Sequence, residues 1–141
     1  MNLQEFINYY NGTFVDFDKN GRFWCVDLMR RYFVDVLGIS GWSLLAKTYS
    51  YQIFESMPDC GDENFIKIYN SKTNYPVAGD ILFFKKKVLG IVLFHHVCIV
   101  AFAGLNWICS FDQNWPIGKP AKYMTHNYNG AIGWLRPIKK K

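Results

Sequence analysis

The stretch Ile81-Leu-Phe-Phe-Lys-Lys-Lys-Val-Leu-Gly-Ile-Val-Leu-Phe-His-His-Val-Cys-Ile-Val-Ala-Phe102 decides the fold class of this chain. It holds two apolar runs rich in Ile, Val and Phe, with lysines and a glycine between them. Runs of this kind, punctuated by Gly or Pro, are typical of consecutive short antiparallel strands. The same composition returns at Trp107–Phe111 and at Ala131–Leu135. The second half of the chain is therefore predicted to form an antiparallel sheet.

The first half of the chain instead has apolar residues at helical spacing. Residues 2–10 predict a short amphipathic helix, and a second helix is predicted to begin at Cys25 and to end before Gly38. Shorter helical pieces are predicted around 43–54 and 62–69. Helices first and strands later indicate an α+β domain rather than alternating βαβ units.

Length and composition favour one folded domain. The chain has 141 residues, of which 50% are apolar and 19% charged, so it can bury a core of its own and is not intrinsically disordered. We expect a single domain over residues 1–141. The chain has no apolar run of about 18 residues, so no membrane span is expected. Its N-terminus lacks a basic region followed by an apolar run, so no secretion signal is expected.

The charge balance and the cysteines narrow the classes of partner. The net charge is +5, and the lysines gather at 85–87 and at 139–141 without interleaved aromatic residues. Nucleic-acid binding is therefore not expected. The four cysteines form no CxxC pair, so neither a zinc ribbon nor a thioredoxin motif is indicated. We expect free thiols and a monomeric protein.

The segment Asp16-Phe-Asp-Lys-Asn-Gly-Arg-Phe-Trp-Cys-Val-Asp27 has the register of a calcium-binding loop. Oxygen-bearing side chains at alternate positions can converge on Ca²⁺, and the glycine permits the sharp turn. The residue after the glycine contributes its backbone carbonyl, so its side chain is unrestricted. The alternative is a polar turn that caps the next helix. The candidate calcium ligands are Asp16, Asp18, Asn20, Arg22 and Asp27.

One cysteine stands out as a candidate nucleophile. Cys25 lies where the second helix begins, and a helix N-terminus favours the reactive thiolate form of a cysteine. Cys98 and Cys109 lie in apolar strands and are interpreted as packing thiols. Cys60, between a proline and a glycine, is interpreted as a loop thiol without a role.

A nucleophilic cysteine requires a base and a group that orients the base. His95 and His96 open an apolar strand and face opposite sides of it, so only one of them can point at a given site. Asp112 and Asn114 share one face of the next strand, and either could accept a hydrogen bond from an imidazole. The alternative is a structural histidine together with a polar turn.

Five stretches of the chain, taken in order, carry a resemblance to a known family. They are Val15–Leu28, Pro76–Phe84, His96–Val100, Phe111–Trp115 and Tyr128–Pro137. Together they resemble the CHAP domain, the cysteine, histidine-dependent amidohydrolase/peptidase family of peptidoglycan hydrolases. The chain is especially similar to the CHAP domains of phage endolysins, and the resemblance covers nearly its whole length.

The resemblance implies a papain-like fold with N-terminal helices packed on a twisted antiparallel β-sheet. It places Cys25 at the nucleophile, His96 at the general base, and Asp112 and Asn114 at the positions that orient the base. It also implies a structural calcium ion on the candidate loop. The implied reaction is cleavage of an amide bond of peptidoglycan, by an endopeptidase or an N-acetylmuramoyl-L-alanine amidase.

The resemblance also implies where the protein acts. The implied partner is the peptidoglycan of a Gram-positive bacterium, with neither nucleic acid nor membrane as a partner. The protein is expected in the host cytoplasm before lysis and at the cell wall after holin-type release. No separate wall-binding domain is expected.

Three positions depart from the family pattern. Trp24 stands where many members have Gln, His95 where many have Gly, and Asp112 where many have Glu. Trp24 affects the oxyanion hole if the Gln side chain helps to form it in the family. His95 leaves open an exchange of roles between the two histidines. Asp112 has a side chain one methylene shorter than Glu, which shortens its reach to the imidazole. These departures leave an alternative function, a catalytically inactive, calcium-dependent wall-binding module.

Overall fold

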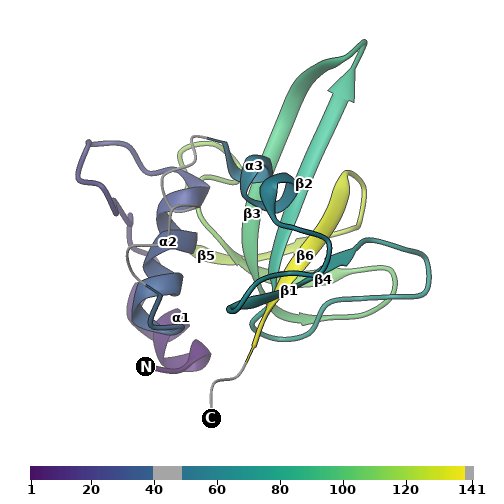
Figure 1. The fold of residues 1–141 in the computed structure, drawn as a ribbon. Helices are drawn as coiled ribbons and strands as arrows, with labels where there is room; N and C mark the ends of the chain where they lie inside the picture. Colours follow the sequence, from purple (N-terminus) through teal and green to yellow (C-terminus); the bar gives the residue numbers. More distant parts are fainter. Residues whose placement is uncertain (40–48, 139–141) are drawn as a thin grey trace.

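The computed structural model describes residues 1–39 and 49–138 and places three helices before a six-stranded sheet (Figure 1). The helices are α1 (Leu3–Tyr10), α2 (Cys25–Asp35) and α3 (Ser50–Ser56). The strands are β1 (Phe65–Tyr69), β2 (Ile81–Val88), β3 (Ile91–Ala103), β4 (Ile108–Asp112), β5 (Lys122–His126) and β6 (Ala131–Pro137). The predicted α+β class, with helices packed on an antiparallel sheet, is confirmed.

The sheet has the strand order β1-β6-β2-β3-β4-β5, and every neighbouring pair is antiparallel. In the β2–β3 pair, Phe84 lies opposite His96. Asp112 ends β4 and His126 ends β5, so these two residues and His96 come from three adjacent strands. The order of the strands thus brings together residues that are far apart in the sequence.

The two main helices begin and end at residues suited to those positions. α1 starts with a capping box, in which the Asn2 side chain accepts a hydrogen bond from the Glu5 N–H at 2.9 Å and the Glu5 carboxylate accepts one from the Asn2 N–H at 3.1 Å. After α2, Gly38 has a φ of 67°, which glycine adopts without strain. Both predicted helices are confirmed.

The core occupies both faces of the sheet. Phe33 of α2 and Phe83 of β2 belong to the larger cluster, which lies between the helices and the sheet. Leu82 and Trp134 belong to a smaller cluster on the other face. Alternate residues of β2 therefore serve different layers. Among the described residues, no helix is long and apolar enough to cross a bilayer.

Two details of the prediction need correction. The helix predicted at 62–69 is wrong, because this segment contains β1, in which Phe65 and Lys67 are buried while Ile66 is exposed. Such alternation belongs to a strand paired along its length, here with β6. The helix predicted at 43–54 lies partly outside the described residues, and α3 occupies its C-terminal part.

Candidate active site

Cys25 is the first residue of α2. The carboxylate of Asp27 fixes this helix start, because it accepts hydrogen bonds from the Trp24 N–H at 2.8 Å and from the Phe17 N–H at 3.1 Å. Cys25 is 9% exposed and lies beside the N–H groups of the first turn, which have no partner within the helix. The helix dipole places partial positive charge beside the sulfur atom.

His96 of β3 lies between the cysteine and a carboxylate. Its Nε2 is 2.6 Å from Asp112 Oδ2, and the Cys25 side chain also interacts with this ring. Burial lowers the pKa of His96, but the hydrogen bonds and charges of Asp112 and Cys25 outweigh burial and raise this pKa to about 10. The site therefore favours an imidazolium beside the sulfur atom.

Asp112 is fully buried and has three side-chain partners. Besides His96, the Nε2 atom of His126 lies 2.6 Å from Asp112 Oδ2, and the Ser110 hydroxyl donates a hydrogen bond to Oδ1. Burial raises the pKa of Asp112, but the bonds from His126 and His96 outweigh it and hold the pKa below its usual value. The sequence alone predicts no role for His126 or Ser110.

Gln113 connects the cysteine segment to the end of β4. Its Oε1 accepts a hydrogen bond from the Val15 N–H at 2.7 Å. Its Nε2 donates to the carbonyl oxygens of Val15 at 2.8 Å and Trp24 at 2.9 Å. Gln113 is buried, so water does not compete for these bonds. Two consecutive residues therefore hold the two halves of the candidate site, since Asp112 contacts His96 and Gln113 contacts the segment that precedes Cys25.

The structure brings Cys25, His96 and Asp112 together but does not bring Asn114 to the imidazole. Asn114 has a φ of 64°, and its Oδ1 accepts a hydrogen bond from the Gly118 N–H at 2.8 Å. No hydrogen bond found among the described residues joins Asn114 to His96, so its predicted orienting role has no support in this geometry.

His95 and His96 face opposite sides of β3, as predicted. The Nδ1 atom of His95 lies 3.1 Å from the Ser50 hydroxyl, and its ring contacts the rings of Tyr49 and Tyr51. Its environment therefore differs from that of His96, which contacts both Cys25 and Asp112. This geometry favours His96 over His95 as the base.

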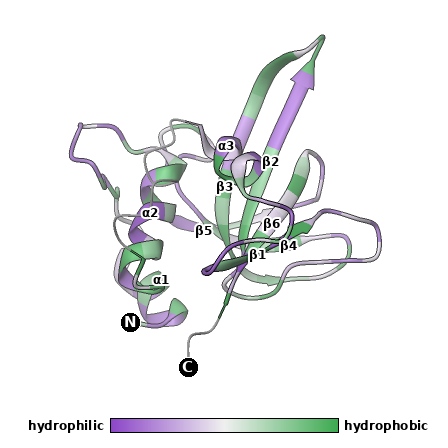
Figure 2. Cartoon of the chain, viewed as in Figure 1, coloured by the Kyte–Doolittle hydropathy of each residue, from purple (hydrophilic) through white to green (hydrophobic). Residues whose placement is uncertain are grey.

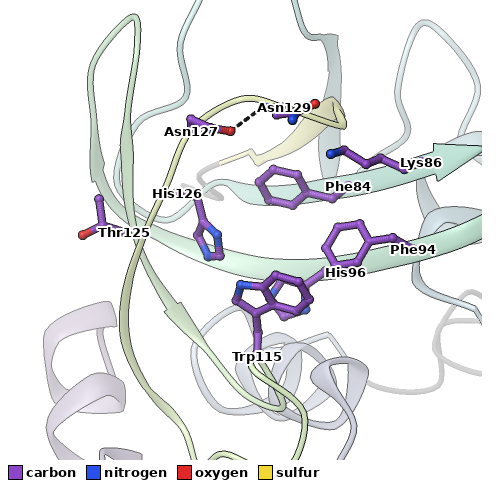
Figure 3. Close-up of a pocket in the computed structure, with 9 residues that line it drawn as sticks. All are labelled: Phe84, Lys86, Phe94, His96, Trp115, Thr125, His126, Asn127 and Asn129. Carbon is purple, nitrogen blue, oxygen red and sulfur yellow. Dashed lines mark hydrogen bonds between the residues drawn. The ribbon is translucent and has the colours of Figure 1, made fainter.

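Two cavities open beside these residues. One, of about 460 Å³, is lined by His96, His126 and aromatic side chains (Figure 3). Its wall includes Trp115, whose ring centroid lies 5.7 Å from that of His96. The other, of about 330 Å³, is lined by Cys25, Trp24 and further residues. His96 and Cys25 thus each line a cavity.

The candidate calcium loop gathers three carboxylates. One oxygen atom from each of Asp16, Asp18 and Asp27 lies within 4.8 Å of the others. Lys19 has a φ of 57° and Gly21 a φ of 82°, and both conformations curl the loop around the carboxylates. The fifth and seventh loop positions, Asn20 and Arg22, are joined by a 2.9 Å hydrogen bond from the Arg22 N–H to the Asn20 side-chain oxygen.

The charge of this loop fits a bound cation. Burial raises the pKa of Asp27, although the backbone N–H groups of Trp24 and Phe17 oppose that effect. A nearby divalent cation would favour the ionised carboxylate. Carboxylate, amide and backbone oxygens are also the donors that Ca²⁺ prefers. The donor set therefore fits calcium.

The protonation of His96 predicts how stability depends on pH. A histidine in the unfolded chain releases its proton near pH 6.5, whereas His96 in the folded chain holds its proton up to about pH 10. The folded state thus binds more protons between these values, so this contribution to the unfolding free energy is complete below about pH 6.5 and is lost as the pH rises to about 10. The slope is at most about 1.4 kcal/mol per pH unit for one proton.

Urea unfolding across this range measures that slope. His96→Gln keeps a hydrogen-bonding side chain but cannot titrate, so the variant is expected to show a shallower decline in stability than wild type. Equal slopes for the two proteins would contradict a protonated His96 in the folded chain.

Comparisons with known proteins establish the fold but not the family. No model of a protein family matches the chain, and no curated protein sequence matches it either. The solved structure of a wild-type endolysin, LysIME-EF1, is similar with a TM-score of 0.71 and 22% identity, over 97% of this chain and 64% of that one. The structure of Ly7917 with the hydrolysing product of MDP is similar with a TM-score of 0.64 and 12% identity, over 94% of this chain and 60% of that one. The chain thus shares the fold of these proteins and spans less than two thirds of the length of each.

Proposed function

We propose that this chain is a peptidoglycan hydrolase of the CHAP type that cleaves an amide bond with Cys25 as the nucleophile. One observation carries the proposal: Cys25 begins a helix and interacts with His96, whose Nε2 lies 2.6 Å from the buried Asp112. Such a series of nucleophile, base and orienting carboxylate is the arrangement that amide hydrolysis by covalent catalysis requires. The chain shares its fold with an endolysin, and this similarity supports the cell wall as the proposed substrate.

In the first half of the reaction, the Cys25 thiolate attacks the carbonyl carbon of the scissile amide. The carbonyl oxygen becomes an oxyanion, and the Cys25 backbone N–H, which has no partner within the helix, is available to stabilise it. The His96 imidazolium then gives its proton to the leaving nitrogen as the C–N bond breaks. The products are a free amine and a thioester on Cys25.

In the second half, neutral His96 takes a proton from water, and the resulting hydroxide attacks the thioester. Cleavage of the C–S bond releases a carboxylic acid and restores the thiolate and the imidazolium. Asp112 keeps the ring oriented through both steps, and His126 holds the same carboxylate oxygen at 2.6 Å. His126 is therefore proposed as a positioning residue that acts through Asp112.

We further propose that the loop before α2 binds calcium through side-chain oxygens of Asp16, Asp18, Asn20 and Asp27 and the backbone carbonyl of Arg22. The ion would supply positive charge that offsets repulsion among the carboxylates. Asp27 links this loop to the nucleophile, because its carboxylate also accepts the Trp24 N–H directly before Cys25. The proposed role of calcium is therefore to hold the segment that presents Cys25.

Calcium is expected to raise the melting temperature of the wild-type protein. A ligand at one hundred times its Kd stabilises a folded protein by about 2.7 kcal/mol, which corresponds to roughly 5–10 °C for a domain of this size. Asp16→Asn removes one carboxylate charge and is expected to lower both this shift and the lytic activity. The measurement is thermal melting and wall lysis with calcium and with chelator.

The control is Glu63→Gln, which removes an exposed carboxylate outside the loop. This variant should keep the full calcium shift. The contrary result is that calcium changes neither the melting temperature nor the lytic activity, in wild type and in Asp16→Asn. In that case the calcium proposal fails and the Cys–His proposal stands.

Digestion of purified walls tests the proposed reaction and identifies the bond. Wild type with calcium should clear a suspension of Gram-positive cell walls, and mass spectrometry of the fragments shows which amide was cut. New amino groups on glycine or other cross-bridge residues mean an endopeptidase, and new N-terminal L-alanine means an amidase. If the walls of several hosts all stay intact, the proposed hydrolysis of peptidoglycan is contradicted.

A further inference from the structure

The outer end of the β2–β3 hairpin presents large apolar side chains to solvent. The hairpin extends beyond the rest of the sheet (Figure 1). Leu89 is 97% exposed, Leu93 66%, Ile91 64% and Val88 53%. These four residues are contiguous on one hairpin, so they form a single apolar tip rather than scattered surface positions.

The turn of this hairpin is unfavourable for the residue that occupies it. Val88 pairs with Ile91, so the loop has two residues, Leu89 with a φ of 51° and Gly90 with a φ of 79°. Two-residue loops with positive φ at both positions favour Asn, Asp or Gly, because larger side chains are strained there. Leu89 bears this cost while remaining almost fully exposed, which points to a contact outside the chain.

Cationic side chains lie directly behind the apolar tip. Lys85 is paired with Glu55 at 2.7 Å, but no ion pair among the described residues includes Lys86 or Lys87, and both are exposed. Residues 85–94 contain no acidic side chain. Figure 2 shows the lysines as a hydrophilic band on β2 beside the hydrophobic outer part of β3.

We infer that this hairpin tip docks on the surface of an anionic lipid bilayer, with Leu89 and Ile91 among the headgroups and Lys87 beside lipid phosphates. A soluble anionic polymer would match the lysines but not the apolar side chains. A second copy of the tip would match the apolar side chains but would bring like charges together. An anionic bilayer matches both features.

This contact is peripheral and requires no membrane-spanning helix. If vesicle binding is found, it will replace the expectation that the protein has no membrane partner. It does not depend on the proposed hydrolase activity, because the four tip residues line neither cavity beside Cys25 and His96. A failure of one proposal therefore leaves the other intact.

Co-sedimentation of the full chain with lipid vesicles tests the inference. Wild type should bind vesicles that contain phosphatidylglycerol more tightly than vesicles of phosphatidylcholine alone. The double variant Leu89→Ser/Ile91→Ser keeps the net charge and should partition about tenfold less, because two side chains no longer enter the bilayer. Lys87→Gln should reduce binding about fivefold, the effect of one lysine near an anionic surface.

Two matched controls separate docking by the tip from general attraction to negative charge. Ile117→Ser removes another apolar side chain that is 86% exposed, and Lys72→Gln removes another exposed lysine. Both controls should bind more tightly than the matching tip variants. The inference is overturned if wild type does not bind anionic vesicles, or if the tip variants and the controls bind equally. It is also overturned if sedimentation velocity shows that the tip joins two copies of the chain and that vesicles do not compete.

Discussion

Cys25→Ala is expected to reduce wall hydrolysis at least about 10⁴-fold, because loss of the proposed nucleophile removes the covalent route altogether. The substitution removes one small atom that is largely buried and interacts with His96, so the melting temperature should fall only slightly. The rate of turbidity loss of a cell-wall suspension, compared with that of wild type at equal concentration and in calcium, measures the effect.

The matched control is Cys60→Ala, which removes the exposed cysteine of a loop. This variant should lyse walls like wild type. Iodoacetamide at neutral pH should modify Cys25 in preference to the buried Cys98, and peptide mapping identifies the modified residue. If Cys25→Ala lyses walls normally, another group is the nucleophile. If wild type binds walls without cutting them and Cys25 is unreactive, the inactive wall-binding module becomes the better description.

Asp112→Asn is expected to lower activity by about 10³–10⁴-fold, because an amide of the same shape cannot hold the imidazolium in its orientation and charge state. It should also destabilise the fold by about 3–5 kcal/mol, because a buried charged group loses its partner. The measurements are the rate of wall lysis and urea unfolding at the same pH.

Two companion variants separate an effect on chemistry from an effect on folding. His126→Gln keeps a donor toward Asp112 and should cost less than about tenfold, whereas His126→Phe removes the donor and should cost about 10–100-fold. The lysis–pH profile should shift in His126→Phe if this residue acts through Asp112 and His96.

Asn114→Ala should keep most of the activity, because Asn114 makes no hydrogen bond to His96 within the part of the chain that the structure describes. A loss of activity as large as that of Asp112→Asn would instead restore Asn114 to the orienting role.

Strands that contain a run of apolar residues could be predicted from the sequence. Strands whose pattern of burial is set by the adjacent strand could not. β2 and β3 are rich in Ile, Val and Phe over their buried parts, so composition alone identifies them. β1 and β5 have five residues each; in β1 buried and exposed residues alternate at first, and in β5 half-buried and exposed residues alternate. A run of five residues is too short for its apolar pattern to separate a strand from a helix, so the sequence wrongly predicts a helix at 62–69.

The same limit applies to the candidate site. Cys25, His96 and Asp112 lie in stretches with recognisable neighbours, so the resemblance could locate them before any coordinates. In the β4–β5 register His126 lies opposite Ile108, yet its ring reaches Asp112, and no spacing in the sequence reports that contact. Asn114 shows the opposite error, because its position two residues after Asp112 predicted a shared face, whereas the chain leaves β4 at Asp112 and turns.

The adjacency of Asp112 and Gln113 has a consequence for tolerance to insertions and deletions. These neighbours bind opposite halves of the site, so the peptide unit between them acts as a spacer of fixed length. A residue added or removed between them would move one half relative to the other, even if every side chain of the site were kept. Length variation among natural or engineered relatives should therefore be tolerated in the turn after Asn114 and be absent between positions 110 and 113.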